Sequence, residues 1–202
     1  MAANPAASLR VSLGDQVLTG TGSVSGHLTL AKGDNEVTVT VTAPNGQSKD
    51  YVFHVTGLSV MALSDVDYES NSSTGWGEIM RNRSVGGNTL RLKKGAEVVT
   101  YETGLGIHAP AHMIYNIAGK GYTRFTAVVG VDAESTTYGD MRFRFLVDGV
   151  EHLRTKDLAH STDGVPVDID LTGASKFEIL VDKISNDWDD HADVADAYFH
   201  TA

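Results

Sequence analysis

The strongest constraint on the fold is a strict two-residue alternation of apolar and polar side chains. Residues 36–42 read Glu-Val-Thr-Val-Thr-Val-Thr, which places valines and threonines on opposite faces of an extended segment. Asn45 and Gly46 follow, and an Asn-Gly pair before a second extended run, here residues 51–55, is typical of a β-hairpin. We therefore predict an antiparallel β-unit in this part of the chain.

The remainder of the sequence also reads as short strands separated by turns. Glycine accounts for 21 of 202 residues and is spread along the chain, whereas helical periodicity is scarce. Asp148-Gly149 predicts a turn after one of these strands. Many short strands at regular spacing are typical of a β-sandwich. The predicted strands are residues 89–92, 98–101, 113–117, 124–129, 142–147, 167–171 and 176–181.

Composition changes along the chain between residues 57 and 63. Both tryptophans and most of the negative charge lie after this point. Because separate domains often differ in composition, we predict a small antiparallel β domain over residues 1–57 and a larger β-sandwich over residues 58–202.

The charge balance excludes several classes of partner. The chain has 16 Lys and Arg against 26 Asp and Glu, a formal net charge of −10. A nucleic-acid binder would need a basic stripe, and anionic lipid would repel this chain. No apolar run is long enough to span a bilayer, so we expect no membrane insertion. The first residues lack the features of a signal peptide, so any targeting signal is expected outside this sequence.

Motifs for catalysis are incomplete. Cysteine is absent, so neither a thiolate nucleophile nor a Cys-ligated zinc is available. Residues 104–109 match the Gly-x-Gly-x-x-Ala form of a dinucleotide loop, but that loop must open a helix and Pro110 follows at once. His108 and His112 are four residues apart, yet Pro110 between them breaks the helix that zinc proteases use. We expect no catalytic activity from this chain.

The most acidic segment is the run from Asp182 to Asp196, with six aspartates in fifteen residues. We interpret it as a loop, because like charges this close repel unless something compensates them. One alternative is a solvated acidic loop. The other is that carboxylates, with backbone carbonyls, bind a hard cation such as calcium. Asp65 and Asp67 are further candidate ligands.

The two tryptophans suggest a sugar site. Trp76 lies between Gly75 and Gly77, a setting more typical of a loop than of a core strand. An exposed indole can stack on the apolar face of a sugar, while the alternative is a ring that folds back over the core. Trp188 lies within the acidic run and has the same two interpretations. An aromatic ring beside carboxylates and a histidine suits a sugar, since the polar groups accept its hydroxyls.

From about residue 61 to 200 the sequence resembles the NPCBM domain, also called carbohydrate-binding module family 51. The resemblance implies a jelly-roll, galactose-binding-like β-sandwich without catalytic activity. It also implies galactose-type carbohydrate as ligand, a structural calcium ion, and covalent attachment to the catalytic domain of an extracellular or cell-surface glycoside hydrolase. The blocks that carry it, in the family's order, are residues 63–68, 75–77, 84–87, 103–109, 114–115, 125–132 and 190–197.

The resemblance and the local chemistry together give candidate site residues. A purely structural role stays open for His108 and Asp193, because buried polar groups also need partners. The candidates for sugar contact are Trp76, His108, Trp188, Asp190 and His191, and those for calcium are Asp65, Asp67, Asp193 and Asp196.

Two positions depart from the family's pattern, which commonly has Trp where this chain has Tyr68 and Val194. If the second position is core packing, Val194 fills less space and the fold survives. If it shapes the ligand loop, galactose specificity changes.

Residues 8–57 resemble the later part of a cadherin-like β-sandwich module, which implies a spacer. The matching stretches are residues 28–43, 45–46 and 49–51. An alternative for the whole chain is therefore a structural or protein-interaction module of a surface enzyme or adhesin, without sugar binding. A hydrolase in its own right is a third hypothesis, which lacks a recognised catalytic constellation.

Overall fold

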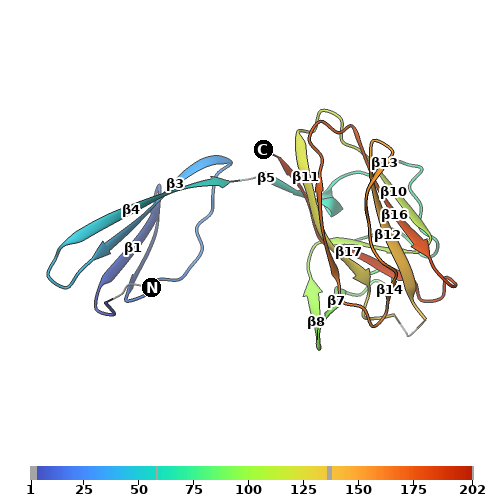
Figure 1. Cartoon of the computed structure of the whole chain (residues 1–202), viewed down its shortest axis with the longest axis horizontal. Helices are drawn as coiled ribbons and strands as arrows, with labels where there is room; N and C mark the ends of the chain where they lie inside the picture. Colours follow the sequence, from blue (N-terminus) through green and yellow to red (C-terminus); the bar gives the residue numbers. More distant parts are fainter. Residues whose placement is uncertain (1–3, 58, 136–137, 202) are drawn as a thin grey trace. The chain divides into compact units, whose positions relative to one another are not determined.

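The computed structural model describes residues 4–57, 59–135 and 138–201. Its regular structure there is β-strand apart from one 3-10 turn, η1 (Leu63–Asp65), so the all-β prediction is confirmed (Figure 1). The chain divides into two compact units, Met1–Ser59 and Val60–Ala202. In the described part of the chain there is no helix of the length and apolarity needed to cross a bilayer.

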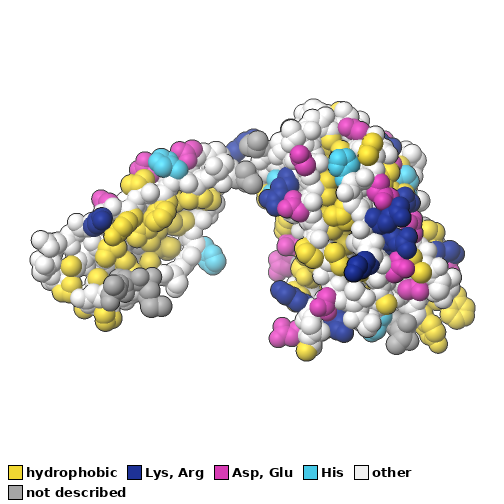
Figure 2. Space-filling view, viewed as in Figure 1, with side chains coloured by type: hydrophobic (Ala, Val, Ile, Leu, Met, Phe, Trp, Pro, Cys, Tyr) yellow, Lys and Arg dark blue, Asp and Glu magenta, His cyan; other side chains and the backbone are white. Residues whose placement is uncertain are grey.

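The first unit is one antiparallel sheet with the strand order β2-β1-β3-β4, comprising β1 (Ser8–Leu13), β2 (Gln16–Thr21), β3 (Gly33–Thr42) and β4 (Ser48–Gly57). The predicted hairpin is confirmed, since β3 and β4 pair along their whole length and Gly46 takes a φ of +87° in the turn. The pairing sets Val37 opposite Phe53 and Val39 opposite Tyr51. Figure 2 shows hydrophobic side chains gathered over this unit. Its cadherin-like character stays a prediction.

The second unit is a sandwich of two antiparallel sheets that face each other across a buried core (Figure 1). One sheet has the order β10-β16-β12-β13, with β14 on β12. The other has the order β15-β11-β17-β9-β6, with β5 on β17, and β7 and β8 form a separate hairpin. The bounds are β5 (Ser59–Ala62), β6 (Met80–Arg81), β7 (Leu90–Lys94), β8 (Glu97–Tyr101), β9 (Gly104–His108), β10 (Ala111–Asn116), β11 (Tyr122–Val131), β12 (Asp140–Val147), β13 (Val150–Arg154), β14 (Leu158–Ala159), β15 (Val165–Asp170), β16 (Lys176–Lys183) and β17 (His191–Thr201).

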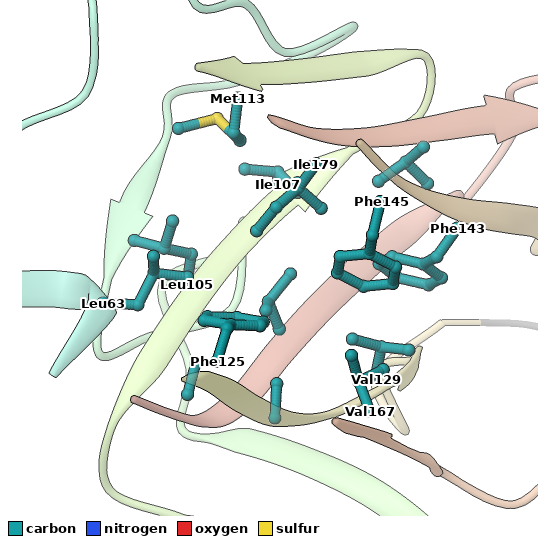
Figure 3. Packing of buried hydrophobic residues seen from close by; sticks show 14 of the residues in the cluster. Leu63, Leu105, Ile107, Met113, Phe125, Val129, Phe143, Phe145, Val167 and Ile179 are labelled. Atoms are coloured by element: carbon teal, nitrogen blue, oxygen red, sulfur yellow. The ribbon is translucent and has the colours of Figure 1, made fainter. Parts of the chain in front are cut away.

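Alternation along the strands builds the core of this sandwich. In β12, Met141, Phe143, Phe145 and Val147 are buried, while the residues between them are less so. Phenylalanines from both sheets meet in the middle (Figure 3), where the ring centroids of Phe125 and Phe145 lie 6.2 Å apart. Burying one such side chain contributes roughly 1.5–3 kcal/mol, so this aromatic cluster is a main source of stability.

The predicted strands of the second unit are all present, within a few residues at their ends. The Asp148-Gly149 turn is also confirmed, with φ of +49° and +81° in the β12–β13 hairpin. The prediction of a loop from Asp182 to Asp196 is wrong at both ends. β16 continues to Lys183, and β17 begins at His191 between β11 and β9. The start of β17 was not recognised because its buried positions from Ala192 to Ala195 hold small residues and one aspartate instead of large apolar residues.

The two glycines of the Gly104-x-Gly106 motif are needed because neighbouring backbone segments pack directly against them. The motif forms β9, a completely buried strand, and opens no helix. A Cβ at Gly104 would lie 2.2 Å from the carbonyl oxygen of Val194 on one neighbour. A Cβ at Gly106 would lie 2.3 Å from the carbonyl oxygen of Arg83. Only glycine lets both neighbouring segments pack this closely.

The contact at Gly106 predicts a large effect of one methyl group. Gly106→Ala should destabilise the second unit by about 1–3 kcal/mol or more, because backbone atoms must move to make room. Gly130→Ala is the matched control, since the nearest atom there is the end of the Leu92 side chain at 3.0 Å, which can rotate away. Urea denaturation followed by circular dichroism measures both, and equal effects of the two substitutions would contradict this explanation.

Candidate functional site

The site is built on the pairing between β9 and β17. In this antiparallel pair, His108 at the end of β9 lies directly opposite His191 at the start of β17. Cross-strand neighbours project to the same face, and the two ring centroids are 5.6 Å apart. Beyond the strands, the amide of Ala109 donates to the carbonyl of Asp190 at 3.0 Å, which extends the pairing past the histidines.

Trp76 completes a cluster of rings over these histidines. Its loop is tied to β9, because Gly75 N donates to the carbonyl of His108 at 2.9 Å. A Cβ at Gly75 would lie 2.7 Å from the carbonyl oxygen of Ala109, so glycine is required for this contact. The Trp76 ring lies nearly parallel to His191, at 5.8 Å and 12°, and meets His108 at 5.8 Å and 61°. We refer to Trp76, His108 and His191 as the ring cluster.

The ring cluster opens into a pocket of about 520 Å³. The remaining lining residues are Gly75, Asp187 and Asp189. Trp76 keeps 57 % of its surface exposed, so its ring is not folded into the core. The structure thus brings together three of the five residues predicted to contact sugar. Asp187 and Asp189 belong to the acidic run, but no feature of the sequence distinguished them from its other aspartates.

His108 is held as a neutral acceptor. Its Nδ1 lies 2.7 Å from the carbonyl of Ala109, and because a carbonyl can only accept, Nδ1 carries the proton. Burial lowers the pKa of His108, and the carboxylates of Asp187 and Asp189 only partly oppose that effect. At neutral pH its Nε2 is therefore free of a proton and can accept a hydrogen bond.

His191 is oriented by Glu134, a residue that the sequence did not single out. Glu134 Oε1 lies 2.7 Å from Nδ1 of His191, and Oε2 accepts from Nδ2 of Asn88 at 2.7 Å. Burial opposes ionisation of Glu134, but hydrogen bonds from Asn88, Ser84 and His191 keep its pKa below the ordinary value. Glu134 is thus ionised at neutral pH and accepts a hydrogen bond from Nδ1–H of His191, which leaves Nε2 of His191 for a ligand.

The two other residues predicted to contact sugar lie elsewhere. Asp190 is completely buried, and its Oδ1 accepts from the backbone amide of Asp140 at 2.8 Å. It therefore joins two loops behind the pocket and does not line it. Trp188 also lies outside the pocket lining, with its ring 6.4 Å from that of Tyr138.

The four aspartates predicted to bind calcium do not form one site. Asp65 and Asp67 are exposed around η1, and Asp67 contacts Arg81 at 3.4 Å. Asp196 is exposed at a bulge in β17, whereas Asp193 on the same strand is completely buried. Within residues 4–57, 59–135 and 138–201, no group of three or more His, Asp or Glu side chains is arranged to hold a metal ion.

Asp193 has a buried acidic neighbour that sequence reasoning missed. The backbone amide of Arg91 donates to Oδ2 of both Asp132 and Asp193, at 3.0 and 3.2 Å, and both side chains are 0 % exposed. Burial and the adjacent Asp132 raise the pKa of Asp193. Its Oδ1 has no hydrogen-bond partner. Two carboxylates this close need a shared proton or a cation between them.

Comparison with known families decides the classification. Residues 59–200 match the NPCBM/NEW2 domain. This chain belongs to the NPCBM/NEW2 family. The match covers the whole second unit except its last residues.

Solved structures of the same class agree with this assignment. A CBM51 domain of Clostridium perfringens GH95, in complex with methyl-galactose, is 28 % identical, with a TM-score of 0.67 over 70 % of this chain and 99 % of that one. The CBM51-2 and INT domains of C. perfringens ZmpB, with CBM51-2 in complex with GlcNAc, are 25 % identical, with a TM-score of 0.66 over 95 % of this chain and 40 % of that one. The NPCBM unit is therefore a non-catalytic carbohydrate-binding module of the kind found in glycoside hydrolases.

A curated relative has a much longer chain. A putative endo-alpha-N-acetylgalactosaminidase of Renibacterium salmoninarum is 30 % identical over 122 residues, which are 58 % of this chain and 8 % of that protein. The present chain thus spans less than a tenth of the relative that it matches.

The structure resolves the two interpretations of Val194. The side chain is 0 % exposed and belongs to the hydrophobic core, so this departure from the NPCBM pattern changes packing. Tyr68 packs partly buried against the same core, with the guanidinium of Arg81 5.2 Å from its ring centroid.

Burial of Asp190 predicts a pH dependence of stability. Burial raises its pKa from 3.8 to about 6, so the ionised form is disfavoured in the folded state. Between about pH 4 and 6 the unfolded chain loses this proton first, so stability falls as pH rises. Asp190→Asn keeps an acceptor for Asp140 and should remove a loss of about 1–3 kcal/mol at pH 7.

The measurement is the free energy of unfolding of both proteins from pH 4 to 7 in calcium-free buffer. The wild-type curve should fall relative to that of Asp190→Asn and run parallel above about pH 6. Asp65→Asn, at an exposed position, is the control. Parallel curves for wild type and Asp190→Asn throughout would contradict the role of burial.

Proposed function

We propose that the ring-cluster pocket binds a terminal galactose, so that the module holds an attached glycoside hydrolase close to galactose-containing glycans. The observation that carries the proposal is the exposed indole of Trp76, fixed beside two histidines whose Nε2 atoms are free for a ligand. An aromatic ring with adjacent polar groups matches a sugar, which has an apolar C–H face and a rim of hydroxyls.

The chemistry of galactose fits this arrangement. Its axial 4-hydroxyl leaves the hydrogens on C3, C4 and C5 on one face, which can stack on the Trp76 indole. Hydroxyls at the rim can donate to Nε2 of His108 and His191 or to the carboxylates of Asp187 and Asp189. The charged acceptors make these hydrogen bonds stronger than neutral ones.

The ligands seen with relatives support a hexose but differ in kind. The GH95 domain was solved with methyl-galactose and the ZmpB domain with GlcNAc. We infer an extracellular location and a covalently attached hydrolase domain. Support comes from the CBM51 domain of GH95, from the CBM51 domains joined to the M60 catalytic domain of ZmpB, and from the much longer curated relative, which is named as a glycosidase. The alternative, a spacer or protein-interaction module, predicts no sugar binding at all.

Substitution of the stacking ring tests the proposal. Wild type should bind methyl β-galactoside with a Kd of ~0.1–1 mM, about −4 to −5.5 kcal/mol, and GlcNAc more weakly. Trp76→Ala should weaken binding at least tenfold and leave the melting temperature within about 1 °C, since the ring is mostly exposed. Isothermal titration calorimetry measures both ligands.

Tyr51→Ala, an exposed ring of the first unit, is the control and should bind as wild type does. If Trp76→Ala binds galactoside as tightly as wild type does, the ring-cluster pocket is not the sugar site. Tighter binding of GlcNAc than of galactoside would overturn the galactose assignment while keeping a sugar site. A large drop in melting temperature would mean that the ring is structural.

We also propose that the module binds a structural calcium ion. Support comes from the buried pair Asp132 and Asp193, because a cation there would offset two carboxylates and give Oδ1 of Asp193 a partner. Asp65, Asp67 and Asp196 lie away from this pair and do not complete the site. Calcium that binds only the folded state raises stability by mass action.

Chelation tests the calcium proposal. Removal of calcium with EDTA at pH 7 should lower the melting temperature by several degrees, and calcium in excess should restore it, whereas magnesium should not. Asp193→Asn should abolish this calcium response, and Asp67→Asn should leave it intact. An identical melting curve with and without EDTA would argue against a structural ion.

A further inference from the structure

Two aromatic rings beside the pocket are left in solvent. Trp188 is 70 % exposed, the highest fraction for any large hydrophobic side chain in the described residues, and Tyr138 is 60 % exposed. Their ring centroids are 6.4 Å apart with an angle of 79° between the planes. Large apolar side chains that are exposed next to each other are a feature of binding surfaces. We call Trp188 and Tyr138 the outer ring pair.

The loops that carry the outer ring pair are anchored to each other. Asp140 follows Tyr138 closely, and its backbone amide donates to the buried Asp190. Its Oδ1 accepts from the amide and the hydroxyl of Ser185, at 3.1 and 3.0 Å. Trp188 N donates to Oδ1 of Asn186 at 2.8 Å, which fixes the turn before the ring. These four hydrogen bonds tie the segment after Tyr138 to the loop that carries Trp188.

The outer ring pair adjoins the ring-cluster pocket through the loop that carries Trp188. Asp187 and Asp189, on either side of Trp188, both line that pocket, and both act electrostatically on His108. The same short loop therefore contributes carboxylates to the pocket and an indole to the surface next to it. A ligand that fills the pocket and extends along this loop would reach the outer ring pair.

We propose that the outer ring pair is a second binding subsite, which stacks the next sugar of a neutral oligosaccharide whose terminal galactose occupies the pocket. The inference rests on the proposed function. Aromatic rings suit the C–H face of a second sugar as they do the first. The ligand is neutral, because Asp187 and Asp189 at the junction would repel a carboxylated sugar.

Comparison of a monosaccharide with an oligosaccharide tests the second subsite. Titration calorimetry on the full chain uses methyl β-galactoside and lactose. Wild type should bind lactose roughly five- to tenfold more tightly than methyl β-galactoside. Trp188→Ala and Tyr138→Ala should each lose most of the preference for lactose and keep the affinity for methyl β-galactoside within about twofold.

Two further variants separate the possible failures. Phe53→Ala, an exposed ring of the first unit, should retain the preference for lactose, and Trp76→Ala should lose both ligands. Unchanged lactose affinity in Trp188→Ala and Tyr138→Ala would overturn the second subsite while leaving the pocket in place. Equal losses for both ligands in Trp188→Ala would move Trp188 into the first subsite. If wild type binds methyl β-galactoside but binds lactose no more tightly, the second subsite is also overturned. If wild type binds neither sugar, the proposed function itself is overturned.

Discussion

The register between β9 and β17 is the constraint on which the site depends. His108 and His191 are neighbours only because Gly106 pairs with Asp193 and Ile107 with Ala192. A slip of either strand by one residue would turn its histidine to the opposite face of the sheet and separate the two imidazoles. The register is held on both sides. The glycines of β9 admit close backbone neighbours, and the amide of Asp132 donates to the carbonyl of His191 at 2.9 Å. Trp76 then follows, since its loop is tied to the carbonyl of His108.

In the second unit, the residues that stabilise the fold and those that form the candidate site lie in different parts of the sandwich. The centre of the sandwich is a cluster of phenylalanines, which contributes most through burial of apolar area. The end that carries the pocket holds buried carboxylates instead. Asp190 and Asp193 are costly to ionise where they lie, and Oδ2 of Asp190 has no hydrogen-bond partner. These buried carboxylates oppose folding at the end that carries the pocket, as is common where polar groups are held ready for a ligand.

Much of the fold was predictable from alternation and turn residues, because strands such as β12 place large apolar side chains at every second position. β17 was not predicted because its first half is buried on both faces, so the small residues Ala192 and Val194 alternate with a buried Asp193 and give no apolar–polar contrast. The ring cluster was predictable from residue type, because a tryptophan between two glycines, together with histidines that can accept hydroxyls, is typical of a sugar site. Glu134 was not, because it lies 57 residues from His191 in sequence and only the fold brings them together. The predicted calcium ligands lie in two regions of the chain, since Asp65 and Asp67 are near η1 and the other two are on β17. The contact of Asp193 with Asp132 could not be predicted, because the fold alone brings these distant residues together.

Nuclear magnetic resonance of the two indole N–H groups tests the central claim most directly. The chain has only two tryptophans, and a Trp188→Phe variant assigns both signals. On titration with methyl β-galactoside, the Trp76 signal and the ring signals of His108 and His191 should shift together with one dissociation constant. His112 and its partner Glu178 both lie on the sheet that does not carry the ring cluster, so the signals of His112 should not shift. Saturating shifts at His112 with no change at Trp76 would contradict a sugar site at the ring cluster.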